Sequence, residues 1–324
     1  MTRHRVRLAI RDWDFLTPIV VGDVRSPDLE VTIERLDALV ADPAHHPNCD
    51  GAEVSFSRYA RERVQGIAQG TAHGTGGLVG LPHFLMRAFR HRCIITAKAS
   101  SITGIAGLAG KTIGLEGWPD SGHIWTRALL RREGIGVGDV HWRVGRLTAA
   151  DPIRPHAGDF GWPGRIEVLP NDKPTLGLLE TGEIDAVFAP FMPPGFHEAG
   201  SRLRALLPDY RAAEVAYFRD VGYVPGIHVL ALKPEAVAAR PGLGQALSEL
   251  IDESTRVWLA KRAKYAETTP WMIDELARST RDLPSGWDRN GFAANEAMID
   301  AFAEEIFAQR VTQRRLSPRE LFPG

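Results

Sequence analysis

Short apolar runs alternate with longer amphipathic stretches along most of this chain. A run of four to eight apolar residues bounded by turn residues predicts a strand, whereas apolar residues spaced three and four apart predict a helix. This alternation indicates an α/β protein with mainly parallel sheets. The expected strands are Val6–Ile10, Leu29–Leu36, Ala52–Phe56, Cys93–Ala97, Thr112–Leu115, Ile166–Leu169, Ala186–Ala189 and His228–Leu232. The expected helices include Ser57–Gln69, Gly122–Glu133, Pro174–Thr181, Pro241–Leu259, Pro270–Thr280 and Phe292–Gln309.

The length of the chain favours two lobes, because 324 residues exceed the roughly 250–300 at which one core stops growing. Hydrophobic residues make up 44% and charged residues 24%, which is an ordinary globular mixture and excludes disorder and fibres. Asp139–Asp172 is rich in Gly, Pro and His with weak periodicity. We expect long loops around two short strands there.

The charge balance argues against nucleic acid and membranes as partners. Lys and Arg number 39 against 40 Asp and Glu, so no overall field attracts a polyanion. Any anion must therefore be bound locally. Only six of the basic residues are Lys, and the others are Arg, whose planar fork suits a carboxylate.

Cysteine usage and apolar run lengths predict a cytoplasmic protein. Cys49 and Cys93 are too few for a disulfide framework and lack zinc spacing. The N-terminal apolar run is shorter than the ~7–15 residues of a secretion signal, and no run reaches the ~18–20 residues of a membrane span. The sequence has no histidine spacing typical of a metal site, no glycine-rich phosphate-binding loop and no dinucleotide-binding motif. We therefore expect neither a metal nor a cofactor.

Arg11, Asp12 and Trp13 directly follow the first expected strand. Ligands of open α/β sheets bind beyond the carboxyl ends of strands. Trp13 could stack on an aromatic ligand, and Arg11 could pair with its carboxylate. Alternatively this is a surface turn in which Asp12 caps the next helix and Trp13 packs at the edge of the lobe.

Ser55 and Ser57 lie where a strand ends and a helix begins. Backbone N–H groups and a hydroxyl can converge on an anion at such a junction. Ser57 is also an ordinary helix N-cap, and the two roles are compatible.

Four basic side chains fall within the six residues Arg87–Arg92, which suits a dicarboxylate. In an extended segment, Phe89 and His91 would point one way and Arg90 and Arg92 the other. His91 is a candidate proton donor because the ordinary pKa of a histidine is about 6.5. The alternative is a solvated basic loop.

The helix expected from Gly122 has polar residues at its beginning. Ser121, Gly122 and His123 could offer N–H groups to a carboxylate. Arg127 lies four residues beyond His123 on the same helical face. Glu116 precedes this helix and is a candidate proton acceptor.

His228 stands among apolar residues in the sequence VPGIHVL. A lone histidine in such a strand is commonly a core residue with its hydrogen bonds satisfied. Its alternative role, as a catalytic proton donor, depends on what lies beside it in the fold.

Three segments resemble type II periplasmic-binding proteins: LAGKTIGL, LLETGEIDAVFAP and VPGIHVLALKPEAVAARPGL. This resemblance implies two α/β lobes joined by two hinge crossovers, which we expect near Ile94–Lys98 and Gly222–His228. Lobe one would comprise residues 1–96 and 224–324, lobe two residues 97–223, with a ligand cleft between them. The second crossover would line the cleft floor, which favours a functional role for His228.

Over nearly the whole chain, further segments resemble 4,5-dihydroxyphthalate decarboxylase. They are RLAIRDWD, EVSFSRY, FRHRCI, LLPDY, ANEAMIDAFAEE and LSPRELF. Two segments depart from the family pattern: Arg11–Asp14 replaces a sequence like GDYD, and Asp120–Thr126 differs from the usual residues. The first departure leaves open a different or more anionic ligand.

The resemblance implies a cytoplasmic lyase of aromatic compound catabolism that removes CO2 from a hydroxylated aromatic acid without a cofactor. Arginines and helix N-termini would anchor the carboxylate. His91 or His228 would protonate the ring carbon, and Asp12 or Glu116 would accept the hydroxyl proton. The alternative is a solute-binding module for an aromatic carboxylate in an ABC-type transporter. A homo-oligomer is compatible with either function.

Overall fold

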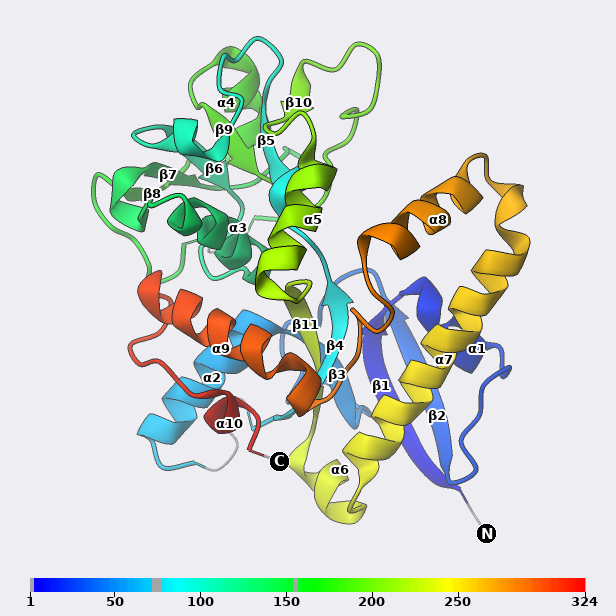
Figure 1. The fold of residues 1–324 in the computed structure, drawn as a ribbon. Coiled ribbons are helices and arrows are strands. Elements are labelled where there is room, and N and C mark those ends of the chain that lie inside the picture. The colour runs from blue at the N-terminus through cyan, green and yellow to red at the C-terminus, as the bar shows by residue number, and fades with distance from the viewer. Residues whose placement is uncertain (1–2, 72–76, 154–156, 324) are drawn as a thin grey trace. The chain divides into compact units, whose positions relative to one another are not determined.

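A computed structural model describes residues 3–71, 77–153 and 157–323. Its chain divides into two compact α/β units (Figure 1). Unit 1 comprises Met1–Arg87, Gly226–Asp300 and Leu316–Gly324, and unit 2 comprises Ala88–Pro225 and Ala301–Arg315. The division therefore falls at Arg87/Ala88 and Pro225/Gly226, close to the lobe boundaries expected from the sequence. Those boundaries and the cleft stay predictions.

Unit 1 contains a five-stranded sheet in the order β2-β1-β3-β11-β4. The parallel pairs are β1 with β2 and β1 with β3, whereas β11 runs antiparallel to both β3 and β4. Four strands therefore share one direction and β11 opposes them. The strands are β1 His4–Arg11, β2 Leu29–Leu36, β3 Gly51–Ser55, β4 Val79–Arg87 and β11 Gly226–Leu232.

Unit 2 contains a six-stranded sheet in the order β10-β5-β9-β6-β7-β8. Here β5 is the strand that opposes the others, because it runs antiparallel to both β10 and β9. In each sheet the reversed strand is the first one after the chain has arrived from the other unit. The strands are β5 Ile94–Ala97, β6 Thr112–Leu115, β7 His141–Val144, β8 Ile166–Val168, β9 Ala186–Phe188 and β10 Leu203–Ala205.

Helices cover both sheets. Those of unit 1 are α1 Thr17–Val20, α2 Phe56–Ala68, α6 Pro234–Ala239, α7 Leu243–Tyr265, α8 Met272–Asp282 and α10 Pro318–Leu321. Those of unit 2 are α3 Ser121–Arg132, α4 Thr175–Thr181 and α5 Tyr210–Val221. The helix α9, Phe292–Ala308, begins in unit 1 and ends in unit 2. None of the described helices is long and apolar enough to cross a membrane.

Alternation along β1 explains how unit 1 buries its core. Val6, Leu8 and Ile10 point to one face, where they pack with apolar residues of α7 such as Leu247 and Ile251. Helices α1 and α7 accordingly lie side by side although they are far apart in the sequence (Figure 1).

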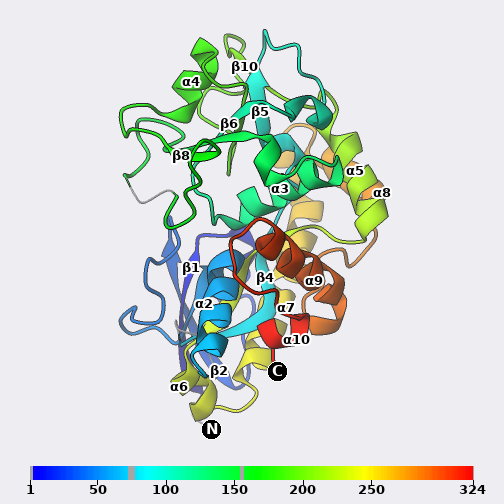
Figure 2. The same ribbon diagram turned by 90° about the vertical axis from the view of Figure 1, so that its left-hand side faces the viewer.

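The opposite face of this sheet is covered by α2 and the C-terminal segment (Figure 2). The ring of Tyr59 lies 5.3 Å from that of Phe322, and its hydroxyl donates to the Leu321 carbonyl at 2.6 Å. Burial raises the pKa of Tyr59 to about 12. This contact ties the chain end to the helix that begins directly after β3.

The expected α/β class with two mainly parallel sheets agrees with these elements, and the two short strands expected in Asp139–Asp172 are β7 and β8. The extended conformation expected for Arg87–Arg92 is wrong. His91–Cys93 form a 3₁₀ turn in which the Cys93 N–H donates to the Arg90 carbonyl at 3.0 Å. A turn has no two-residue alternation, so the side-chain directions inferred from alternation do not apply.

We expect Tyr59→Phe to destabilise unit 1, because it leaves the buried Leu321 carbonyl without its donor. Such a loss costs roughly 1–3 kcal/mol in the free energy of unfolding. Urea titration followed by circular dichroism measures the effect, with Tyr210→Phe at an exposed tyrosine as the matched control. Equal unfolding curves for wild type and Tyr59→Phe would contradict the anchoring role.

Candidate active site

Glu53 is a carboxylate buried at the centre of unit 1, with only 1% of its surface exposed. It lies on β3, and its Oε2 accepts hydrogen bonds from the Arg11 backbone N–H at 3.0 Å and the Trp13 indole N–H at 2.9 Å. The other oxygen, Oε1, lies 2.5 Å from His228 Nδ1. A buried carboxylate needs such donors because burial without them is costly.

His228 is brought to Glu53 by the pairing of β11 with β3. His228 lies opposite Ser55, and Leu230 lies opposite Glu53, so these four residues share one face of the sheet. An ionised carboxylate only accepts hydrogen bonds, so in that form Glu53 accepts from the Nδ1–H of His228. Nε2 has no hydrogen-bond partner among the residues that the structure describes. It is the ring nitrogen available for chemistry.

Arg11 is the last residue of β1 and Trp13 lies in the turn that follows it, and both donate to Glu53. The Arg11 guanidinium lies 5.1 Å from the centre of the Trp13 ring. Asp12 points elsewhere and pairs with the exposed Arg35 at 3.2 Å. It makes no cap to the following 3₁₀ turn, so the expectation that Asp12 caps the next helix is wrong.

Ser55 and Ser57 flank the start of α2, which begins at Phe56. Ser55 is the N-cap residue, but its side chain makes no capping hydrogen bond. Ser57 is completely buried within the first turn. The N-cap position lies two residues before Ser57, so the N-cap role expected for Ser57 is wrong.

Arg90 in unit 2 is a buried cation without a counter-ion. Only 3% of it is exposed, and it forms no ion pair with any residue of the described chain. Its guanidinium donates to the carbonyls of Ala189 at 3.0 Å and Pro190 at 3.4 Å. A buried charge that meets only neutral acceptors favours an anionic ligand.

The N-terminus of α3 lies against Arg90. A Cβ atom at Gly122 would come within 3.0 Å of the guanidinium carbon, so a larger residue there would have to displace the Arg90 side chain. Arg90 and the positive end of the helix dipole therefore lie together with the carboxylate of Asp120, which caps this helix. Ser121 is buried at the first position of the helix.

The expectation that the His123 N–H is available for a ligand is wrong, because it already donates to Asp120 Oδ1 at 2.9 Å. Its side chain is completely buried. Asp120 is the N-cap of α3, and its carboxylate accepts the hydrogen bond that a ligand would otherwise accept from this N–H.

Arg127, one turn beyond His123 on α3, is buried inside unit 2 with 1% of its surface exposed. It stacks 3.9 Å from the Trp118 ring centre and donates to the Trp118 carbonyl at 2.7 Å and Gln309 Oε1 at 2.6 Å. Burial lowers its pKa to about 9. These contacts hold the loop that precedes α3 and favour a positioning role. The ring of Trp125, also on α3, lies 5.3 Å from that of Phe302.

His91 and Arg92 are held by α5. The His91 ring meets that of Tyr217 at 5.4 Å, and burial lowers the pKa of His91 to about 4, assisted by Arg132 and Arg92. Arg92 pairs with the buried Glu214 at 3.2 Å. His91 is therefore buried and uncharged at neutral pH, whereas the side chain of Arg92 is 47% exposed beside Glu214.

Glu116 is buried with 7% of its surface exposed, on the loop after β6.

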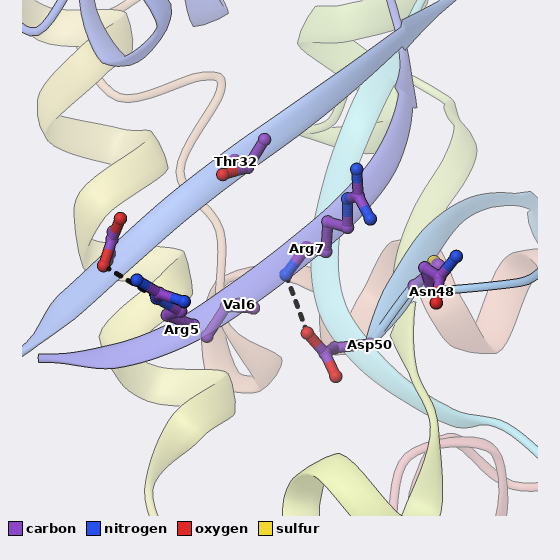
Figure 3. Close-up of a pocket in the computed structure, with 8 residues that line it drawn as sticks. Arg5, Val6, Arg7, Thr32, Asn48 and Asp50 are labelled. Atoms are coloured by element: carbon purple, nitrogen blue, oxygen red, sulfur yellow. Dashed lines mark hydrogen bonds and ion pairs between the residues drawn. The ribbon is translucent and has the colours of Figure 1, made fainter.

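A pocket of about 580 Å³ lies elsewhere, near the start of β1 (Figure 3). Two contacts link residues of its lining: Arg5 pairs with Glu30, and the Arg7 backbone N–H donates to Asp50. Within residues 3–71, 77–153 and 157–323, no three His, Cys, Asp or Glu side chains form a metal-binding group.

Sequence reasoning missed Glu53, the residue that joins the candidates of unit 1. A signal was present, because Glu53 interrupts the apolar run of an otherwise buried strand. A carboxylate at such a position requires partners. Its partners lie 42 and 175 residues away, so spacing alone does not identify them.

No family model matches the chain. It is 26% identical over 330 residues to a Comamonas testosteroni protein named 4,5-dihydroxyphthalate decarboxylase, with 99% of this chain and 97% of that protein covered. A Pseudomonas putida protein of the same name is 25% identical over 226 residues, covering 69% of this chain and 84% of the relative. The resemblance inferred from the sequence segments is thereby confirmed.

Among solved structures, the periplasmic aliphatic sulphonate binding protein SsuA from Escherichia coli matches with a TM-score of 0.56 at 14% identity. The match covers 98% of this chain and 97% of that protein. At this identity the likeness concerns the fold alone. The expected type II periplasmic-binding-protein-like fold is confirmed.

We expect His91 to make the protein less stable in mild acid. Its pKa is about 4 in the folded chain and about 6.5 when unfolded, so the unfolded chain binds the proton more tightly. The free energy of unfolding should therefore fall as the pH drops from 6.5 to 4, by up to roughly 3 kcal/mol for this group. Urea titrations across this range measure the slope.

His91→Gln should flatten that slope, because glutamine does not titrate. The exposed His45 supplies the control variant His45→Gln, which should leave the slope unchanged. A slope in His91→Gln as steep as that of the wild type would show that other groups, such as the buried His83 with its pKa lowered to about 3, cause the acid sensitivity.

Proposed function

We propose that this chain is a cofactor-independent decarboxylase of a hydroxylated aromatic carboxylic acid such as 4,5-dihydroxyphthalate. Similarity to two proteins of that name, one along nearly the whole chain, supports this substrate class. The observation that carries the proposal is the buried contact between Glu53 and His228. A protein that only binds a carboxylate has no need of an oriented proton carrier.

The reaction replaces a carboxylate by a proton. A hydroxyl para to the carboxylate loses its proton and pushes electrons into the ring, and an acid protonates the carbon that bears the carboxylate. The bond to the carboxylate then breaks, its electron pair returns to the ring, and CO2 leaves. The protein must anchor a carboxylate, supply one proton and accept another.

His228 supplies the proton to the ring carbon from Nε2, while Glu53 holds Nδ1 and stabilises the imidazolium. His91 suits this task less well, because its pKa of about 4 leaves it without a proton to give near neutral pH. Asp12 and Glu116 are the two candidates for accepting the hydroxyl proton of the substrate. Asp12 is already paired with Arg35, which favours Glu116.

Arg90 and the N-terminus of α3 bind a carboxylate of the substrate, since that guanidinium is buried without a counter-ion. Arg11 and Trp13 add a cation and an aromatic surface beside His228. The cleft between lobes, a cytoplasmic location, the absence of a cofactor and a homo-oligomer stay predictions. The transporter-module alternative lacks an observation in its favour.

The first experiment measures release of CO2 from 4,5-dihydroxyphthalate and related hydroxybenzoic acids. His228→Asn keeps a hydrogen bond to Glu53 but cannot titrate, so kcat should fall by about 10²–10⁴ with little change in KM. Glu53→Gln presents an amide to Nδ1 and should lower kcat through the wrong tautomer. In heavy water the wild type should place deuterium at the carbon that lost CO2.

His91→Asn is the control and should retain activity. If His91→Asn abolishes turnover and His228→Asn does not, the proton donor lies on unit 2. If the wild type releases CO2 from none of these acids but still binds them, the chain is a binding module.

The second experiment measures binding of phthalate by calorimetry. Arg90→Ala should weaken binding about tenfold to a hundredfold, since a charge-assisted bond contributes roughly 1.5–3 kcal/mol. Gly122→Ala should weaken it less, because the new Cβ pushes the guanidinium aside without removing it. Arg204 is the matched control, since it is likewise held by backbone carbonyls. Wild-type affinity in Arg90→Ala would exclude this anchor.

A further inference from the structure

The helix α8 differs from the other long helices of unit 1 because none of its eleven residues is buried. It follows α7 after the short 3₁₀ turn Ala266–Thr268, which contacts both helices (Figure 1). A helix of this length is marginal in water by itself and needs packing on one face. The contact with α7 includes a hydrogen bond from Arg262 to the sulfur of Met272 at 3.3 Å. Most residues of α8 are therefore exposed.

Apolar residues of α8 form a stripe along one face. Ile273, Leu276 and Ala277 are spaced three and four residues apart, and Thr280 continues the same line. Ile273 is 47% exposed. Trp271, which directly precedes the helix, is 81% exposed, the largest value among the large hydrophobic residues described. An apolar stripe beside an exposed tryptophan is typical of a protein interface.

The charges at the edge of this stripe are self-complementary. Asp274 and Arg281 are seven residues apart, so they lie on the same edge of the stripe about two turns from each other. Neither forms an ion pair with a residue of the described chain. When two such helices pack antiparallel, equal edges face each other, and Asp274 of one meets Arg281 of the other.

We propose that the α8 stripe is an isologous interface, and that its occupant is the α8 stripe of a second copy of this chain. A two-fold axis near Leu276 and Ala277 places the stripes together and forms the Asp274–Arg281 pair twice. The indole of Trp271 adds apolar area at each end of the contact. A membrane surface fits less well, because that would call for a basic polar face, and this one carries both signs.

The proposal does not depend on the enzymatic function. Analytical ultracentrifugation of the full chain should give a dimer whose dissociation constant responds to α8. Asp274→Arg alone and Arg281→Asp alone should each weaken the dimer roughly tenfold, because each variant replaces two attractive contacts by two repulsive ones. The double variant should regain the wild-type dissociation constant, since the swapped charges pair again.

Ile273→Glu places a charge in the stripe and should yield monomers. The matched control is Val21→Glu, at another exposed aliphatic residue of unit 1, which should leave the dimer intact. Circular dichroism checks that each variant is folded. The proposal is overturned if the wild type is monomeric up to about 100 μM, where an ordinary interface would be populated. It is also overturned if a dimer persists in Ile273→Glu, or if the double variant is no better than the single ones.

Discussion

The sheet of unit 1 depends on a strand that the chain supplies only after most of unit 2. All seven residues of β11 are buried, and this strand joins β3 to β4. Without β11 the two halves of the sheet have no hydrogen bonds to each other. Such a long-range pairing closes a large loop before its contacts form, which slows folding. His228 lies on this strand, so the candidate active site forms only with the completed sheet.

The same strand explains how a charged Glu53 is tolerated in the core. A carboxylate that is 1% exposed would destabilise the fold unless donors surround it. Its donors come from the turn after β1 and from β11, on either side of β3. Satisfying one buried charge thereby fixes the backbone at Arg11, the indole of Trp13 and the tautomer of His228. Arg90 in unit 2 presents the opposite case, a buried charge that the described chain leaves without a counter-ion.

Local patterns in the sequence predicted the elements whose composition agrees with their environment, such as α3, β6 and β11. They missed β4, because Gly80 and Pro82 are strand breakers. Proline is accepted there because β4 is an edge strand of its sheet. They also missed α5, although Asp209 caps it by accepting the Ala212 N–H. The site was predicted as separate residues, and the contact that unites them was not, because Glu53 and His228 meet only through the pairing of β11 with β3.

Because α9 ends in unit 2, a gene fragment that encodes only the continuous segment Ala88–Pro225 does not encode all of unit 2. A segment cut at Ala88 and Pro225 would keep every strand of its sheet but lose Ala301–Arg315. Gln309, which accepts from Arg127 and donates to the Ile124 carbonyl, would be lost with it. The excised piece would contain a buried guanidinium with one acceptor fewer and an open core beneath Trp125. If unit 2 were exchanged between related proteins during evolution, the fifteen residues Ala301–Arg315 would have to be exchanged together with Ala88–Pro225.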